Sequence, residues 1–147
     1  MIFLIFSSVC LNAIDRESTL KIYHSVFNAL SPKDPIIVYT NDNDYRDVFQ
    51  YSKRIILTDH ANESDIVLIT NERTLNDILY TMNENMDISK KPIMFVTNYH
   101  FLKISNKIVG AFYWRKGRSQ LLFIKKRLEH YEITLPEEYQ RFMIDEL

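Results

Sequence analysis

The residues that could do chemistry in this chain of 147 residues are few and scattered. His60 and Glu63 form an H-x-x-E pattern, but zinc needs three or four converging ligands and no further ligand lies near this pair. Asp42 and Asp44 could hold a cation, yet their segment lacks the glycine and the distal glutamate of a calcium loop. We therefore expect no metal site, and we predict that this acidic pair caps a helix.

Catalytic and nucleotide-binding motifs are absent from the sequence. Serine and histidine are plentiful, but no G-x-S-x-G motif is present to expose a serine at the end of a strand. The chain contains only two glycines, Gly110 and Gly117. Walker and dinucleotide-binding loops need several glycines close together, so both are excluded. These observations predict a protein that is not an enzyme and carries no cofactor.

A Thr-Asn pair closes each of three apolar runs, IIVYTN, IVLITN and IMFVTN. Uninterrupted apolar runs suit strands that are buried on both faces, as in a parallel sheet covered by helices. Ligands of such sheets meet the carboxyl ends of the strands, so the paired residues are candidate ligand-binding residues. They would converge only if the three strands are neighbours, and helix capping explains the pattern equally well. The candidates are Thr40, Asn41, Thr70, Asn71, Thr97 and Asn98.

A second group of candidates surrounds a tight turn in the C-terminal third. Residues 108–114 and 120–124 predict two antiparallel strands with Gly117 in the turn. Aromatic and cationic side chains gather there, a combination that is typical of interface anchors. The candidate partner-surface residues are Tyr113, Trp114, Arg115 and Arg118. A solvated hairpin end with Trp114 packed inward is an alternative, whereas the net charge of -1 disfavours nucleic acid.

Apolar periodicity predicts the helices that hold this sheet in place. A helix over 15–30 begins at Asp15, a short helix follows the first strand, and a third helix follows the second Thr-Asn pair. A polar loop over 83–91 leads to the strand 93–97. The T-x-x-E box of Thr134 and Glu137 predicts a last helix. Together these elements predict an α/β domain with a mainly parallel sheet, a single layer of strands between helices, and an antiparallel C-terminal hairpin.

The first thirteen residues, MIFLIFSSVCLNA, have the apolar region and the small residues of a secretory signal. They are too few to span a bilayer as a helix. We expect residues 1–13 to be a signal-peptide remnant and residues 14–147 to form one domain in the periplasm. No positive residue precedes the apolar run, so two alternatives stay open: an N-terminal strand MIFLIF and a cytoplasmic location.

The C-terminal third also carries an ordered pattern of apolar positions around one glycine turn. The pattern consists of Val109, Gly110 and Phe112, then Gly117, then Phe123, and finally Ile133 and Leu135 before the last helix. In this order the segment resembles the end of the YfiR-like family of exported bacterial proteins. The family's Glu-Ile-Asn is replaced by Ile124-Lys125-Lys126, and the paired cysteines of some members are absent, so redox control is not carried over.

The resemblance implies a non-enzymatic, periplasmic regulatory domain that binds a protein partner, a membrane-bound signalling protein. Two other functions stay open. A small-ligand receptor of the solute-binding kind would use the strand ends as its pocket, although a chain this short supplies one of the two lobes that such receptors use. A cytoplasmic flavodoxin- or receiver-like module is the third; receiver domains need an acidic cluster at a strand end, where this chain has Thr-Asn.

Overall fold

A single sheet of seven strands forms the centre of the molecule, in the order β2-β1-β3-β4-β5-β6-β7. The computed structural model describes residues 2–82 and 91–147, with side chains described from residue 16. The expected loop over 83–91 therefore lies almost wholly outside the described residues. The strands are β1 (Ile36–Tyr39), β2 (Ile55–Thr58), β3 (Ile66–Ile69), β4 (Ile93–Val96), β5 (Ile108–Arg115), β6 (Arg118–Ile124) and β7 (Met143–Ile144).

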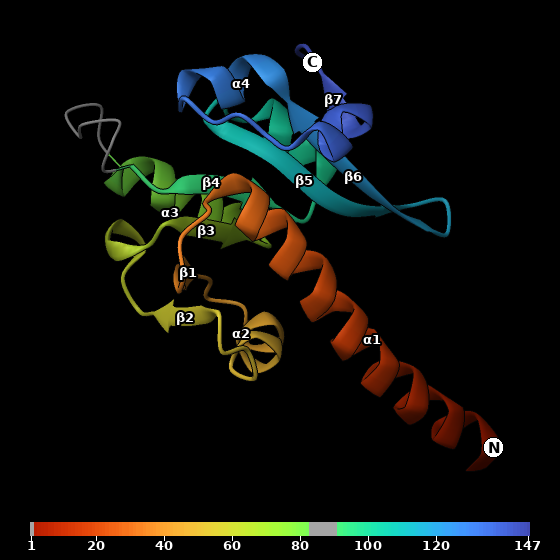
Figure 1. Cartoon of the computed structure of the whole chain (residues 1–147). Helices are drawn as coiled ribbons and strands as arrows, with labels where there is room; N and C mark the ends of the chain where they lie inside the picture. The colour runs from red at the N-terminus through yellow and green to blue at the C-terminus, as the bar shows by residue number, and fades with distance from the viewer. Residues whose placement is uncertain (1, 83–90) are drawn as a thin grey trace.

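The pairing of the strands confirms the predicted fold class. Strands β2, β1, β3, β4 and β5 are parallel to their neighbours, β5 and β6 are antiparallel, and β7 adds to β6 in parallel. The order 2-1-3-4-5 is one of the two common orders of doubly wound α/β sheets. Helices lie on both faces of this sheet (Figure 1).

Burial on both faces explains why the apolar runs become strands. All four residues of β3 are fully buried, and they alternate between two apolar clusters because successive side chains of a strand point to opposite faces. Ile66 and Leu68 join the first cluster, whereas Val67 and Ile69 join the second. A polar residue at any of these positions would lie inside a core, which accounts for the uninterrupted apolar run.

Helices and short 3-10 helices cover the two faces. On the first face, α1 packs its Tyr23 and Phe27 beside Phe49 of α2; on the second, α3 packs Leu75 beside Phe101 of η3. The helical elements are α1 (Ile2–Leu30), α2 (Asn43–Phe49), η1 (Ala61–Glu63), α3 (Glu72–Thr81), η3 (Tyr99–Lys103), α4 (Lys125–His130) and η4 (Glu137–Phe142).

Helix α1 begins earlier than the sequence predicted. It starts at Ile2, so Asp15 lies within the helix and does not begin it, and the alternative strand MIFLIF is wrong. No glycine or proline occurs between Ile2 and Leu30, so no residue of the segment interrupts a helix that continues beyond the sheet. The N-terminal half extends away from the rest of the molecule (Figure 1). Within residues 2–82 and 91–147, no helix has the length and apolarity needed to cross a membrane.

The predicted C-terminal hairpin is confirmed. Arg115 and Arg118 pair across the strands, and the two residues between them, Lys116 and Gly117, have φ angles of 51° and 76°. Two successive positive φ angles in a two-residue loop are characteristic of a type I′ turn, which glycine favours. At the other end of β5, a Cβ on Gly110 would lie 2.6 Å from the carbonyl oxygen of Leu122, so only glycine fits there without a backbone shift.

The predicted capping box near the C-terminus is wrong. Pro136 stands at the cap position of η4, and no side chain caps this 3-10 helix. The segment of the predicted last helix is the 3-10 helix η4, and Met143 directly after it begins β7. Arg127 ties α4 to the segment from η3 to β5, because its Nη1 donates hydrogen bonds to the carbonyl oxygens of Leu102, Ser105 and Ile108. It also contacts the end of the chain, where its Nε donates to Glu146 Oε1 at 3.1 Å. Pairing with β6 and these long-range contacts decide the course of the last residues.

Candidate functional site

The three Thr-Asn pairs come together at one edge of the sheet. They follow β1, β3 and β4, which are adjacent and parallel, so the condition for their convergence is met. Convergence at the carboxyl edge of a doubly wound sheet is the arrangement in which ligand sites usually form. The hydrogen bonds of each pair decide which of these residues are free to bind a ligand.

Helix capping is confirmed after β3 and β4. Asn71 Oδ1 accepts a hydrogen bond of 2.8 Å from the backbone N–H of Thr74, in the first turn of α3. Asn98 Oδ1 accepts one of 2.9 Å from the backbone N–H of His100, in η3. Each asparagine side chain thereby satisfies a backbone donor that has no partner within its own helix.

The pair after β1 behaves differently, so the predicted cap at Asn41 is wrong. Asp42 is the cap of α2, because its Oδ1 accepts from the backbone N–H of Asp44 at 2.9 Å and of Tyr45 at 3.4 Å. The expectation that the acidic pair caps a helix is therefore confirmed for Asp42. Asn41 Nδ2 instead donates a hydrogen bond of 2.7 Å to Thr74 Oγ1, across to α3.

The three threonines also have different roles. Thr40 is fully buried, and its Oγ1 accepts a hydrogen bond of 3.3 Å from the backbone N–H of Asp42. Thr70 Oγ1 is buried and has no hydrogen-bond partner among the described residues. Thr97 is half-buried and lines an open cleft. Of the three, therefore, Thr97 is the one placed to meet a ligand in a cleft.

Two adjacent clefts lie beside the hairpin at this edge of the sheet. The first, here called the basic cleft, has a volume of about 670 Å³ and lies between η3 and β5. It is lined by Thr97, Asn98, Tyr99, His100, Lys103, Tyr113, Trp114 and Arg115. The second, here called the α1 cleft, has a volume of about 410 Å³. It is lined by Ser18, Thr19, Ile22, Tyr45, Thr97, Phe112, Tyr113, Trp114 and Ser119.

The basic cleft joins residues that the sequence placed in two separate groups. Thr97 and Asn98 come from the strand ends, and Tyr113, Trp114 and Arg115 come from the hairpin. The other four strand-end candidates and Arg118 line neither cleft. The structure thus brings together half of the predicted site residues in one place.

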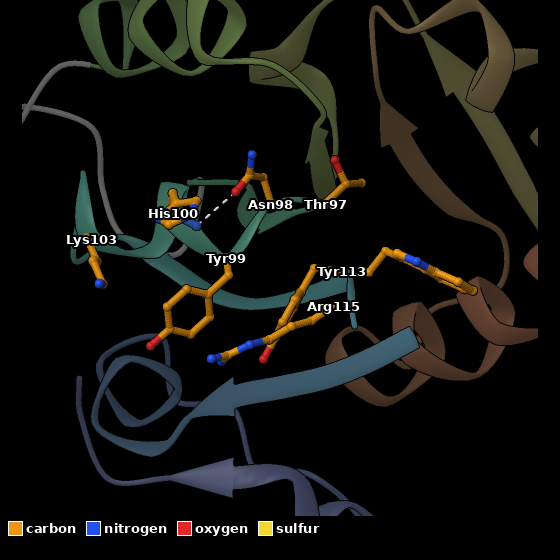
Figure 2. Close-up of a pocket in the computed structure, with 8 residues that line it drawn as sticks. Thr97, Asn98, Tyr99, His100, Lys103, Tyr113 and Arg115 are labelled. Carbon is orange, nitrogen blue, oxygen red and sulfur yellow. Dashed lines mark hydrogen bonds between the residues drawn. The ribbon is translucent and has the colours of Figure 1, made fainter. Parts of the chain in front are cut away.

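Tyr113 and Trp114 are adjacent in β5 and point in opposite directions, as the alternation of a strand requires. Tyr113 is half-buried, with its ring centroid 5.4 Å from that of Tyr99. Trp114 is 72% exposed, so the alternative in which it packs inward is wrong. Figure 2 shows the side chains of Tyr99, Tyr113 and Arg115 extending to the same side of the sheet. Lys103 Nζ lies 5.4 Å from the centroid of the Tyr99 ring, within the range of a cation–π contact.

The cationic side chains around the basic cleft have no acidic partners among the described residues. Lys103, Arg115, Lys116 and Arg118 form no ion pair with any residue that the structure describes. No described residue that lines either cleft is acidic. Arg115 and Arg118 stand directly opposite each other on neighbouring strands, an arrangement of like charges that opposes folding.

Sequence reasoning missed the contributions of η3 and α1 to these clefts. The signal for η3 was present, because Tyr99, His100 and Lys103 follow the third Thr-Asn pair directly. No signal in the sequence placed Ser18 or Thr19 of α1 beside the hairpin. That neighbourhood depends on the way in which the helix crosses the sheet.

The comparisons with known proteins establish the fold alone. No family model and no curated protein matches the chain. The crystal structure of a conserved domain protein from Vibrio cholerae O1 biovar El Tor is similar, with a TM-score of 0.61 and 10% sequence identity. The match covers 84% of this chain, which spans 58% of the length of that protein's chain. The chain therefore has an α/β fold that a solved structure shares.

Proposed function

We propose that this protein is a non-enzymatic binding module that acts through a protein partner docked on the β5–β6 hairpin. The observation that carries the proposal is Trp114, an indole that is 72% exposed and lines two clefts at once. Tryptophan, tyrosine and arginine are the residues that most often dominate the binding energy of an interface. Trp114 also stands between Tyr113 and Arg115 in the sequence. Its residue type and its neighbours therefore both fit an interface anchor.

Exposure alone does not single out this surface. Tyr80 on α3 is 90% exposed and Tyr51 is 68% exposed, and neither lines one of the two clefts. Isolated exposed apolar residues are common on protein surfaces and need no explanation. Trp114 differs because a partner's side chains could fill a depression on either side of its ring.

We base the proposed location on the first residues of the sequence and the proposed kind of partner on the family resemblance. The thirteen apolar and small residues at the start favour export to the periplasm, and the resemblance to the YfiR-like family favours a membrane-bound signalling protein as partner. We expect expression from a start codon that restores a basic region to give a periplasmic product beginning near Ile14. Intact-mass measurement of the fractionated protein tests this, and an uncleaved chain in the cytosolic fraction would contradict it.

A photo-crosslinking amino acid at position 114 tests the partner directly in the native host. The same amino acid at position 80 is the matched control, because both positions are exposed and aromatic. We expect a discrete crosslinked band from position 114, containing one host protein by mass spectrometry, and none from position 80. Equal bands from both positions, or no band from position 114, would refute docking on the hairpin.

A small-ligand receptor is the second candidate, and the volume of the basic cleft favours it. About 670 Å³ lies within the range of small-ligand pockets, which is roughly 300–1,000 Å³. A ligand that binds the folded state raises the melting temperature. A small molecule that stabilises the parent protein, but not the Asn98→Ala variant, would favour the receptor over the protein-binding module.

A further inference from the structure

We propose that the basic cleft binds the carboxylate side chains of an acidic segment of the protein partner. This inference rests on the proposed function and adds the chemistry of the partner. It concerns the space between η3 and β5, where Lys103 and Arg115 stand at the cleft and Arg118 lies beside it on the facing strand.

The charge distribution is the first argument. The whole chain has a net charge of -1, yet the cleft and the adjoining turn carry four cations that lack an acidic partner among the described residues. The cations are Lys103, Arg115, Lys116 and Arg118. Four basic residues elsewhere in the described part of the chain pair with carboxylates, as Arg46 does with Asp59 at 3.0 Å, and most of the others are unpaired like those of the cleft. What distinguishes the four cations of this surface is that they lie together with no acidic residue in the lining of the cleft. A set of cations left uncompensated on one surface is complementary to a negatively charged partner.

The direct opposition of Arg115 and Arg118 is the second argument. The two residues are cross-strand partners beside the tight turn, so their charged groups share one face of the hairpin. Like charges held opposite each other lower the stability of the free protein. A carboxylate bound between two guanidinium groups removes this repulsion, and arginine suits the task because it can donate two parallel hydrogen bonds to one carboxylate.

The lining of the cleft distinguishes a peptide from a lone ion. Tyr99 and Tyr113 form an aromatic wall, and Asn98 and Thr97 supply polar atoms at its end. The α1 cleft, which Trp114 also lines, contains no charged residue; Ile22 and Phe112 form an apolar part of its lining beside hydroxyl groups such as that of Ser18. A chain with acidic residues followed by an apolar residue would fill both clefts and cover the exposed indole, whereas a small anion would leave the α1 cleft empty.

Peptide binding can be followed by the fluorescence of Trp114, because Trp114 is the only tryptophan in the sequence. The probe is a short synthetic peptide of alternating Glu and Ser that ends in Leu, and the neutral control replaces each Glu by Gln. We expect the acidic peptide to change the Trp114 fluorescence saturably and the neutral peptide not to. Raising the ionic strength should weaken binding, since exposed charges are screened by salt.

Matched charge changes test where the peptide binds. We expect Arg115→Gln and Lys103→Gln each to weaken binding about 2- to 5-fold, the range of an exposed ion pair. Lys125→Gln removes the same charge at the start of α4, which follows the end of the antiparallel β6 and so lies at the opposite edge of the sheet. It should leave the affinity unchanged. Thermal melting of each variant checks that the fold is intact.

Three results would overturn the inference. One is equal binding of the neutral peptide, and another is a loss with Lys125→Gln as large as that with Arg115→Gln, which would indicate non-specific attraction. The third is equally tight binding of free glutamate, or of vesicles that contain anionic lipid, because the ligand would then not be a protein segment. A crosslink at position 114 combined with any of these results would retain the docking surface while rejecting its acidic occupant.

Discussion

Asn41 Nδ2 donates a hydrogen bond of 2.7 Å to Thr74 Oγ1, and this contact joins the end of β1 to the first turn of α3. Thr74 is itself bound to Asn71, because its backbone N–H donates to Asn71 Oδ1. Two of the three Thr-Asn pairs are thereby linked through one buried threonine. The asparagines at these two strand ends are thus engaged in holding the strand ends and α3 together.

This contact predicts coupled losses of stability. Asn41→Ala should lower the free energy of unfolding by about 0.5 to 1.5 kcal/mol, the net contribution of one hydrogen bond. Thr74→Val removes the same contact, so the loss in the double variant should be smaller than the sum of the two single losses. Urea unfolding measures all three values. Strict additivity would show that the hydrogen bond does not contribute in solution.

The buried Arg127 side chain should contribute more to the stability of the fold than its salt bridge with Glu146 does. Its guanidinium donates to three backbone carbonyls and contacts Glu146 at 3.0 Å. Arg127→Met should cost about 1 to 3 kcal/mol or more, the penalty of leaving buried carbonyl acceptors without a donor. Glu146→Gln should cost less, since it leaves the three carbonyl contacts in place and its ion pair, on a side chain that is 37% exposed, is partly screened. Chemical denaturation of both variants checks this, and similar losses would contradict it.

Tyr113 and Trp114 should respond differently to truncation. Tyr113→Ala should lower stability by about 1 to 3 kcal/mol, because the ring packs against Tyr99. Trp114→Ala should change it by less than about 0.5 kcal/mol, as expected for an exposed position, while removing binding to the partner. Thermal melting and the crosslinking assay measure the two effects. If both variants melt far below the parent and binding is not selectively lost, the hairpin is core structure.

His24 should make stability depend on pH. Burial, with a smaller contribution from the nearby charge of Arg54, lowers the pKa of His24 from its ordinary value of 6.5. The unfolded chain therefore takes up this proton at a higher pH than the folded one, so stability should fall as the pH drops below about 6.5. Its Nε2 also contacts the hydroxyl of Ser52.

The variant for this prediction is His24→Gln, measured beside the parent protein. His24→Gln should flatten the loss of stability between neutral and mildly acidic pH, because the glutamine side chain does not titrate. Unfolding curves in urea across this pH interval provide the measurement. An identical pH profile for the parent and the His24 variant would exclude His24 as the source.

Much of the fold follows from local pattern. Strand β3 can be recognised in the sequence because both of its faces are covered, so that all four of its residues must be apolar. The turn at Gly117 can be recognised because a two-residue hairpin loop requires positive φ angles, which glycine adopts readily. Burial and backbone sterics act on residues that are close in sequence, so the sequence determined these elements by itself.

Other features depend on contacts between distant residues, and only the tertiary structure decided them. Asn41 has the type of a capping residue, but Asp42 caps α2 while Asn41 reaches α3. The T-x-x-E box at Thr134 does not cap a helix, because pairing of β7 with β6 sets the path of the end of the chain. The basic cleft exists because β4 and β5 are neighbours in the sheet, which places the third Thr-Asn pair beside the hairpin. Residue types suggest what a side chain can do, whereas the packing of strands and helices determines which partners it meets.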